Sequence, residues 1–245
     1  MNQANPTLAS TIGNWWRSQR QQYSRSSTLK QLAGLTWEFL RDSLPDRKRQ
    51  RYGDADYDWE FRLDTTGATV GWRTRLLGMF YSGYQPIEPY LFREMLSELA
   101  IDFREFTFID IGSGKGRALF LAAEYPFRRI VGIELLAELN AVAQANIRKL
   151  QDRSAGELNI ETICGDATDY AFPEDPLVLY LFNPLSVLEL KQVMGNLAQS
   201  IEGHSRRVYL VYANPVWERE VIDQSLFSKT ISTRYYSIFT HTPQI

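Results

Sequence analysis

The 245-residue chain has a single cysteine, Cys164, so no disulfide can form within it. A chain without disulfides suits a reducing compartment, and we expect a cytoplasmic protein. No run of 18 apolar residues occurs, so no membrane-spanning helix or integral membrane association is expected. The first residues lack a charged segment followed by an apolar one, so we expect no secretory signal there. The two histidines, His204 and His241, lie far apart in the chain, and we expect no metal site.

The formal charge is nearly balanced, but it is unevenly distributed along the chain. The net charge is −2, and 44% of the residues are apolar, which is enough for a folded core. Residues 1–53 contain nine Lys or Arg against three Asp or Glu, so the remainder of the chain is acidic. The basic arm, residues 41–51, could contact nucleic acid, an anionic membrane or an acidic protein, although a solvated helical face is the simpler interpretation.

The first hundred residues have helical patterns and no repeat or low-complexity tract. Residues 28–44 place leucines and aromatic residues at mostly helical spacing and predict an amphipathic helix. Residues 86–100 predict a second helix with proline at its start, where a missing N–H costs nothing. We therefore interpret residues 1–100 as a helical N-terminal extension that, by position, would act as a lid over a core formed by residues 101–245.

From residue 106 onward, apolar runs alternate with amphipathic helical patterns. This alternation predicts a parallel sheet with helices on both faces, an α/β fold. Two β-rich runs within residues 226–242 are too close together for a helical crossover and should pair as an antiparallel hairpin. The predicted fold is therefore a mostly parallel, seven-stranded sheet. Its first five strands are predicted in FTFIDI, RRIVGIEL, NIETICGD, LVLYLFNP and RRVYLVYAN.

A glycine-rich turn, residues 112–116 (GSGKG), follows the first predicted strand and is compatible with three kinds of nucleotide site. A Walker-type phosphate loop would need a glycine where the chain has Ile109 and a Ser or Thr where it has Gly116. A dinucleotide-binding turn would need its third glycine at the position of Arg117. Asp110 also places a negative charge beside the turn, which repels a pyrophosphate. A phosphate loop is thus excluded, and a dinucleotide is disfavoured but stays open.

S-adenosylmethionine fits this turn better than either phosphate ligand. It has no phosphate, and its sulfonium and ammonium groups are cationic, so an acid at Asp110 suits it. Glycines let the backbone pass close under a ligand. Glu134 ends the second strand and could accept from ribose hydroxyls, while Asp166 and Ala167, after the third strand, could bind the adenine amino group and ring. These strand ends share one edge of the sheet, where such folds bind ligands.

Residues 106–214 resemble class I, Rossmann-like S-adenosylmethionine-dependent methyltransferases. The resemblance rests on the run D-x-G-S-G-x-G, the strand-end Glu, G-D-A and the Asn-Pro after the fourth strand. The terminal hairpin resembles that family's sixth and seventh strands. The resemblance implies donor-binding residues around the methionine part, the ribose and the adenine. These candidates are Asp110, Gly112, Ser113, Gly114, Gly116, Glu134, Asp166 and Ala167.

Two further residues are candidates for the catalytic side of the site. Asn183 follows the fourth strand and could orient an amine nucleophile by accepting its N–H. Its surroundings are similar to the Asn-Pro-Pro-Tyr motif of methylases that act on planar nitrogens, but Leu185 and Ser186 replace the second proline and the aromatic residue. We therefore favour a flexible amine, such as a protein lysine. Tyr84, in GYQPIEP, could contact the donor, line the acceptor channel or simply pack.

Three side chains near these candidates have a plain structural interpretation. Lys115 and Arg117 open a predicted helix, and we expect both to be exposed to solvent. Cys164 lies in an apolar strand end, and we expect a buried thiol rather than a nucleophile.

The predicted function is methyl transfer from S-adenosylmethionine to an acceptor that the sequence does not identify. A protein or a small molecule is favoured as the acceptor over nucleic acid. One alternative is a non-catalytic or NAD-type nucleotide binder of the same fold. Another is a nucleic-acid or membrane interaction module that acts through the basic arm. The sequence carries no information on the oligomeric state.

Overall fold

The fold is that of a computed structural model, in which the chain divides into two compact units, residues 1–85 and 86–245. The division lies upstream of the extension–core boundary expected at residues 100 and 101, and the role of the extension as a lid stays a prediction. Tyr84 and Asn183 lie outside the residues that the structure describes. Those residues are 12–13, 15–17, 19–20, 23–42, 55–66, 86–154, 156, 158–182, 185–223 and 225–243.

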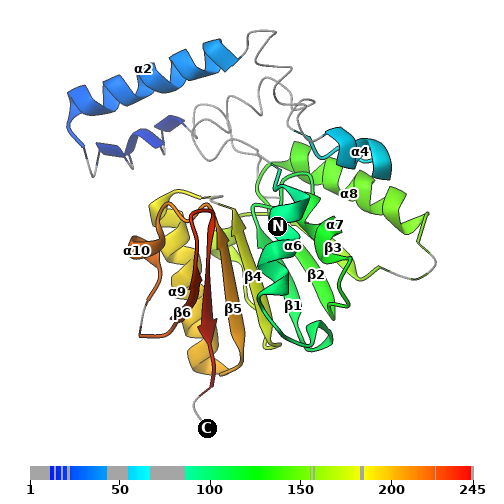
Figure 1. Ribbon diagram of the computed structural model, residues 1–245. Helices are drawn as coiled ribbons and strands as arrows, with labels where there is room; N and C mark the ends of the chain where they lie inside the picture. Colours follow the sequence, from blue (N-terminus) through cyan, green and yellow to red (C-terminus); the bar gives the residue numbers. More distant parts are fainter. Residues whose placement is uncertain are drawn as a thin grey trace. The chain divides into compact units, whose positions relative to one another are not determined.

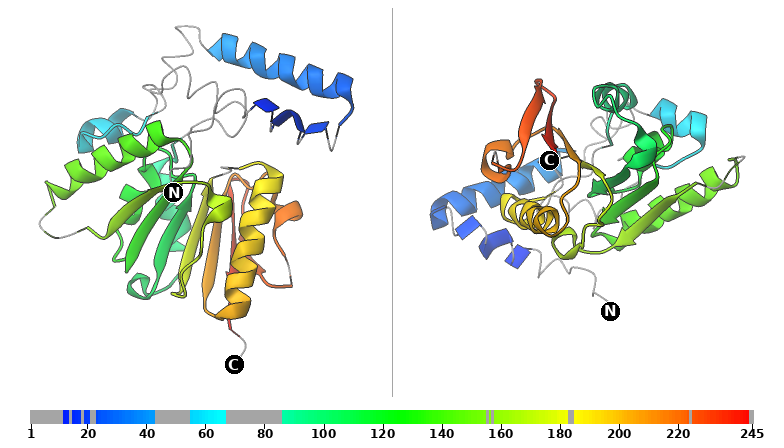
Figure 2. Two further views of the ribbon diagram at one scale, coloured as in Figure 1. Left: turned by 180° about the vertical axis from the view of Figure 1, so that it is seen from behind. Right: turned by 90° about the horizontal axis from the view of Figure 1, so that it is seen from below.

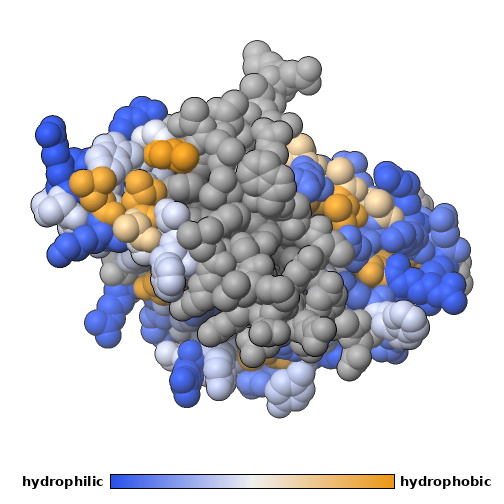
Figure 3. Space-filling view, turned by 90° about the horizontal axis from the view of Figure 1, so that it is seen from above, coloured by the Kyte–Doolittle hydropathy of each residue, from blue (hydrophilic) through white to orange (hydrophobic). Residues whose placement is uncertain are grey.

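The first unit contains two longer helical segments, α2 (Arg25–Asp42) and α4 (Ala55–Phe61). Helix α2 lies where residues 28–44 predicted a helix, and it exposes Trp37 to 67%. After α4 the chain turns back, and the Asp58 carboxylate accepts hydrogen bonds from the backbone N–H groups of residues 65 and 66. Figure 3 shows hydrophobic side chains scattered among hydrophilic ones on the described part of one face.

The second unit is built on one seven-stranded sheet (Figure 1) in the order β3-β2-β1-β4-β5-β7-β6. Strands β1 to β5 pair in parallel, whereas β7 is antiparallel to both β5 and β6. This confirms the predicted Rossmann-like, mostly parallel sheet with an antiparallel C-terminal hairpin. The strands are β1 (Thr107–Ile111), β2 (Arg129–Glu134), β3 (Ile160–Cys164), β4 (Leu177–Phe182), β5 (Val208–Ala213), β6 (Ser228–Ser232) and β7 (Tyr236–His241).

Helices cover both faces of this sheet. In Figure 1, α6 lies in front of the strands and α9 behind them, and the reverse view in Figure 2 agrees. None of the helices in the described ranges is both long and apolar enough to cross a membrane. The helices are α6 (Pro89–Ser97), α7 (Arg117–Ala122), α8 (Ala137–Gln151), α9 (Val187–Gly203) and α10 (Glu218–Val221), with short 3₁₀ turns η2 (Phe103–Glu105) and η3 (Ala167–Asp169).

The two-residue period of the strands divides their side chains between the two faces. Ile109 of β1 and Leu179 of β4 belong to one apolar core with Leu190 and Val193 of α9. We call this side the α9 face. The alternate residues point to the opposite side, the α6 face, where the Phe92 ring of α6 contacts the rings of Phe108 and Tyr180. Asp110, two residues after Phe108, therefore also lies on the α6 face.

Gly132 in β2 allows an unusually close approach on the α6 face. A Cβ atom at this position would lie 2.7 Å from Ser113 Oγ and 2.7 Å from Leu119 Cδ1. The glycine turn and α7 therefore pack directly onto the backbone of β2, and a larger residue would force them away.

We predict that Gly132→Ala lowers the free energy of unfolding by about 1–3 kcal/mol, because an extra methyl group overpacks this contact. The matched control is Gly195→Ala in α9, where an added Cβ meets nothing within 4 Å. That change should raise stability by about 0.5–1 kcal/mol through helix propensity. Denaturant midpoints of the three proteins give the comparison, and a Gly132→Ala protein as stable as the wild type would contradict the close packing.

Candidate functional site

The glycine turn after β1 needs its glycines for backbone reasons. Gly112, Gly114 and Gly116 have φ angles of 77°, 55° and 89°, in the left-handed region that L side chains adopt only with strain. The N–H groups of Gly112 and Ser113 donate to the Ile133 carbonyl at 2.8 and 3.0 Å. The turn is thereby bound to the carboxyl end of β2, with its backbone close to the sheet edge.

The side chain of Glu134, the last residue of β2, also holds this turn in place. Its Oε2 accepts the Gly114 N–H at 2.8 Å, and its Oε1 accepts the Leu136 N–H at 2.7 Å. Burial raises the pKa of the Glu134 carboxyl, while the hydrogen bonds from Leu136 and Gly114 act in the opposite direction. A carboxylate has about four lone-pair sites, so both oxygens keep the capacity to accept a further donor.

Asp110 is a buried acid without a described hydrogen bond. The residue is 3% exposed, and no hydrogen bond described for this part of the chain involves its carboxyl. Burial, and then the charge of Glu134, raise the pKa of Asp110 to about 8. An ionised carboxylate at this position requires a compensating cation, and the site is therefore suited to a positively charged ligand.

The segment after β3 reaches the same edge of the sheet. Asp166 caps the turn η3, and its Oδ1 accepts from both the N–H and the hydroxyl of Thr168 at 2.8 and 2.7 Å. Asn196 of α9 donates to the Thr168 carbonyl at 2.6 Å and holds this segment in place. Ala167 is 6% exposed. The structure thus brings the predicted residues of all three strand ends to one edge.

The predicted exposure of Lys115 and Arg117 is wrong. Their exposed fractions are 1% and 2%, because every residue of α7 is buried and the start of this helix has no solvent side. Asn146 of α8 donates to the Lys115 carbonyl at 3.3 Å, so the turn also packs against that helix. The spacing of charged and apolar residues in such a short helix gives no signal of this burial.

The expectation of a buried Cys164 is also wrong, since the residue is exposed. It ends β3, which is an edge strand and has a sheet neighbour on one side only. Partial burial and the charge of Glu134 raise the pKa of the Cys164 thiol, which disfavours a reactive thiolate.

The sequence patterns did not single out Tyr180. This residue of β4 is the register partner of Asp110 and is 1% exposed on the α6 face. The available signal was a tyrosine inside an otherwise apolar strand, two residues before the strand ends.

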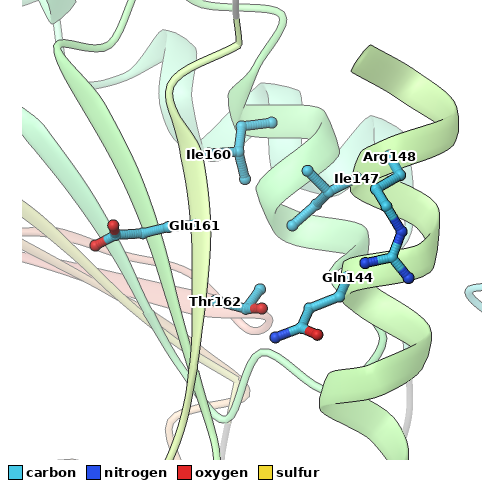
Figure 4. Close-up of a pocket in the computed structure, with 6 residues that line it drawn as sticks. All are labelled: Gln144, Ile147, Arg148, Ile160, Glu161 and Thr162. Carbon is cyan, nitrogen blue, oxygen red and sulfur yellow. The ribbon is translucent and has the colours of Figure 1, made fainter. Parts of the chain in front are cut away.

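A separate open hollow of about 210 Å³ lies between α8 and β3 (Figure 4). Figure 4 shows that the side chain of Glu161 points away from α8. None of the predicted site residues lines this hollow, so the candidate site is defined by the strand ends. The lining residues are Gln144, Ile147, Arg148, Ile160, Glu161 and Thr162. Within the described residues, no group of three His, Cys, Asp or Glu side chains could hold a metal ion.

The raised pKa of Asp110 predicts a specific pH dependence of stability. The unfolded aspartate loses its proton near pH 4, whereas the folded one keeps it to about pH 8. Between these values the folded state holds the extra proton, so its free energy of unfolding falls as the pH rises. Asp110→Asn removes this penalty, and its stability advantage over the wild type should grow from pH 5 to pH 8 by up to about 1.4 kcal/mol per pH unit.

Denaturant unfolding of the ligand-free proteins at pH 5, 6, 7 and 8 measures this difference. The exposed Asp152, which follows α8, supplies a control: Asp152→Asn should track the wild type at every pH. Parallel curves for Asp110→Asn and the wild type would show that the Asp110 carboxyl has an ordinary pKa.

Known proteins similar to this chain include one domain family and several solved structures. Residues 108–202 match the model of a methyltransferase domain family. No curated protein sequence matches the chain. Among solved structures, an RNA methyltransferase from Salinibacter ruber in complex with S-adenosyl-L-homocysteine is similar, with 21% identity, a TM-score of 0.46, and coverage of 66% of this chain and 96% of that one. A magnesium protoporphyrin IX methyltransferase from Synechocystis with bound S-adenosylmethionine has 14% identity, a TM-score of 0.43, and coverage of 63% and 77%.

The strand order and the family match agree with the motifs of the glycine turn and the strand ends. Over residues 108–202, this chain is therefore similar to a methyltransferase domain.

Proposed function

We propose that residues 86–245 bind S-adenosylmethionine at the carboxyl ends of β1, β2 and β3 and transfer its methyl group to an amine. When bound, this donor supplies a methyl group on a positively charged sulfur. The observation that carries the proposal is the buried Asp110 carboxyl, which lacks a described hydrogen bond, beside a glycine turn held by Glu134. We also propose a cytoplasmic location, in keeping with the single cysteine.

The residues present fit the donor group by group. Asp110 lies where a cationic methionine part would remove the cost of its ionised form. The remaining lone pairs of Glu134 suit the two ribose hydroxyls, and the described bonds of Asp166 use only its Oδ1. The three glycines with positive φ leave the backbone free of Cβ atoms along this path. A dinucleotide would instead bring phosphates to two buried acids, which supports the sulfonium donor over NAD.

The acceptor side begins where β4 ends, at Phe182. Leu185 packs against the core of the α9 face, and Ser186 forms a capping box with Glu189 at the start of α9. The positions that resembled a planar-nitrogen motif are thus used for packing and capping. This supports a flexible amine, such as a protein lysine or another amine, over a flat acceptor.

The main contribution required of the protein is to align the donor with the amine for methyl transfer. Holding two reactants in line is worth roughly 7–11 kcal/mol of the barrier in well-oriented systems. The glycine turn and Glu134 would fix the donor, and Asn183 would accept an N–H of the amine and direct its lone pair toward the methyl group. The basic arm, residues 41–51, is left as a prediction for a substrate or partner contact, because residues 43–54 lie outside the described part of the chain.

Removing either acid should weaken donor binding. We predict that Asp110→Ala and Glu134→Ala each raise the dissociation constant for S-adenosylmethionine at least tenfold, about 1.4 kcal/mol. Calorimetric titration measures this, with NAD⁺ as a ligand that should not bind. Glu202→Ala, at an exposed position in the last turn of α9, is the matched control and should bind like the wild type. Unchanged affinity in both acid variants would place the donor elsewhere.

Asn183→Ala should separate binding from turnover. The asparagine is assigned to the amine, so donor affinity should stay within about twofold while turnover falls by roughly 100-fold, a typical contribution from a positioned polar group. Labelled donor and an amine acceptor found by screening give the rate, and calorimetry gives the affinity. If affinity and rate fall together, Asn183 belongs to the donor site instead.

A further inference from the structure

Two polar side chains of the sheet, Asp110 and Tyr180, lie next to Ser113 of the glycine turn. Parallel pairing places Asp110 of β1 between Gly132 of β2 and Tyr180 of β4, all on the α6 face. Ser113 lies directly over Gly132, since its Cβ and Oγ atoms occupy the space that a side chain there would fill. Ser113, Asp110 and Tyr180 therefore form a polar row across three strands, and we use that name for them below.

The polar row lacks hydrogen-bond partners of its own. Tyr180 is 1% exposed and Ser113 is 5% exposed, and the hydroxyl oxygens of both are buried without a partner among the described residues. Buried hydroxyls in native proteins nearly always have a protein or water partner, because leaving one unpaired is costly. A water needs two to four polar partners, and the row offers three. The arrangement indicates a place for an ordered water or a ligand group.

The Tyr180 ring is held so that its hydroxyl has little freedom to turn elsewhere. The ring makes an edge contact with the Phe92 ring, with the ring centroids 5.4 Å apart, and stacks on the Phe108 ring, with the centroids 6.0 Å apart. Burial, and then the nearby charge of Asp110, raise the pKa of Tyr180 well above its usual value. The hydroxyl therefore stays neutral and protonated, and it is able to donate a hydrogen bond to an ionised carboxylate.

The other groups around Asp110 do not take this role. Glu134, at the end of β2, is an acid and opposes a second negative charge. The buried cations Lys115, in the glycine turn, and Arg117, at the start of α7, have contacts of their own. Helix α6 presents a buried face of Phe92, Met95 and Leu96, which has no ionisable group. The hydroxyls of Tyr180 and Ser113 are thus the neutral donors beside Asp110 among the described groups of the row.

We propose that Tyr180 is a positioning residue whose hydroxyl donates toward the Asp110 carboxylate by way of one ordered water shared with Ser113. It thereby favours the ionised carboxylate that the cationic methionine part of the donor requires. This inference rests on the proposed function, since it names how the same site secures the charge that recognises its donor.

The test compares Tyr180→Phe with Tyr212→Phe. Tyr212 is a buried tyrosine of β5 in the core of the α9 face, so its variant controls for loss of a buried hydroxyl from the same sheet. Calorimetry from pH 6 to pH 9 gives the dissociation constants for S-adenosylmethionine. The second ligand is 5′-methylthioadenosine, which keeps the nucleoside and sulfur but lacks the charged amino-acid part.

In the wild type, S-adenosylmethionine should bind more tightly as the pH rises and Asp110 ionises. Tyr180→Phe should weaken this binding about tenfold at pH 7 and move the midpoint up by about one pH unit, because a hydrogen bond to the charged form is lost. Binding of 5′-methylthioadenosine should be unaffected, and Tyr212→Phe should keep the wild-type pH profile.

A wild-type pH profile in Tyr180→Phe, or an equal loss of affinity for both ligands, would overturn the proposal. A wild-type protein that binds no S-adenosylmethionine would instead overturn the proposed function. If Tyr180→Phe does not fold, wild-type protein labelled at the tyrosine Cζ carbons gives a second measurement by NMR. The Tyr180 signal should titrate with Asp110 and lose that response in Asp110→Asn, and a signal indifferent to both would also overturn the proposal.

Discussion

One hydrogen bond, from a backbone N–H of the glycine turn to a buried carboxylate, organises the site. Glu134 binds the Gly114 N–H at 2.8 Å and so joins the turn after β1 to the end of β2. The turn can lie this close to the sheet only because Gly132, which has no side chain, leaves room for Ser113 and Leu119 above β2. Beside this turn Asp110 is almost fully buried, and its charge is therefore costly. The electrostatic character of the site thus follows from packing.

This arrangement makes two acids serve different purposes within one small region. Glu134 receives backbone N–H bonds that partly offset its burial, whereas the Asp110 carboxyl has no comparable described bond. Neighbouring carboxyl groups with different surroundings differ in pKa and in hydrogen bonding, as is common at functional sites. The first acid holds the protein's own backbone, and the second is left for a partner of opposite charge.

Much of the fold could be predicted because its signals are local and periodic. Apolar runs in FTFIDI and LVLYLF became the central strands β1 and β4, and the short spacing near residue 233 required a hairpin. The glycine turn and the strand-end acids were predicted to share one edge because parallel strands deliver their carboxyl ends there. Lys115, Arg117 and Tyr180 were misjudged or missed because their burial depends on which helices cover which face. Cys164 was misjudged because sequence periodicity does not reveal that β3 lies at an edge.

The position of β7 has a consequence for how this chain is made. β7 is the last of the described strands in chain order, yet it lies inside the sheet between β5 and β6. During synthesis, β5 must therefore wait with an open edge until residues 236–241 have left the ribosome, and β6 has only β7 to pair with. Open strand edges invite pairing with other chains, so the nascent protein is most prone to aggregation after β5 has emerged and before β7 has. Pairing of β7 with β5 covers the open edge and ends this exposure.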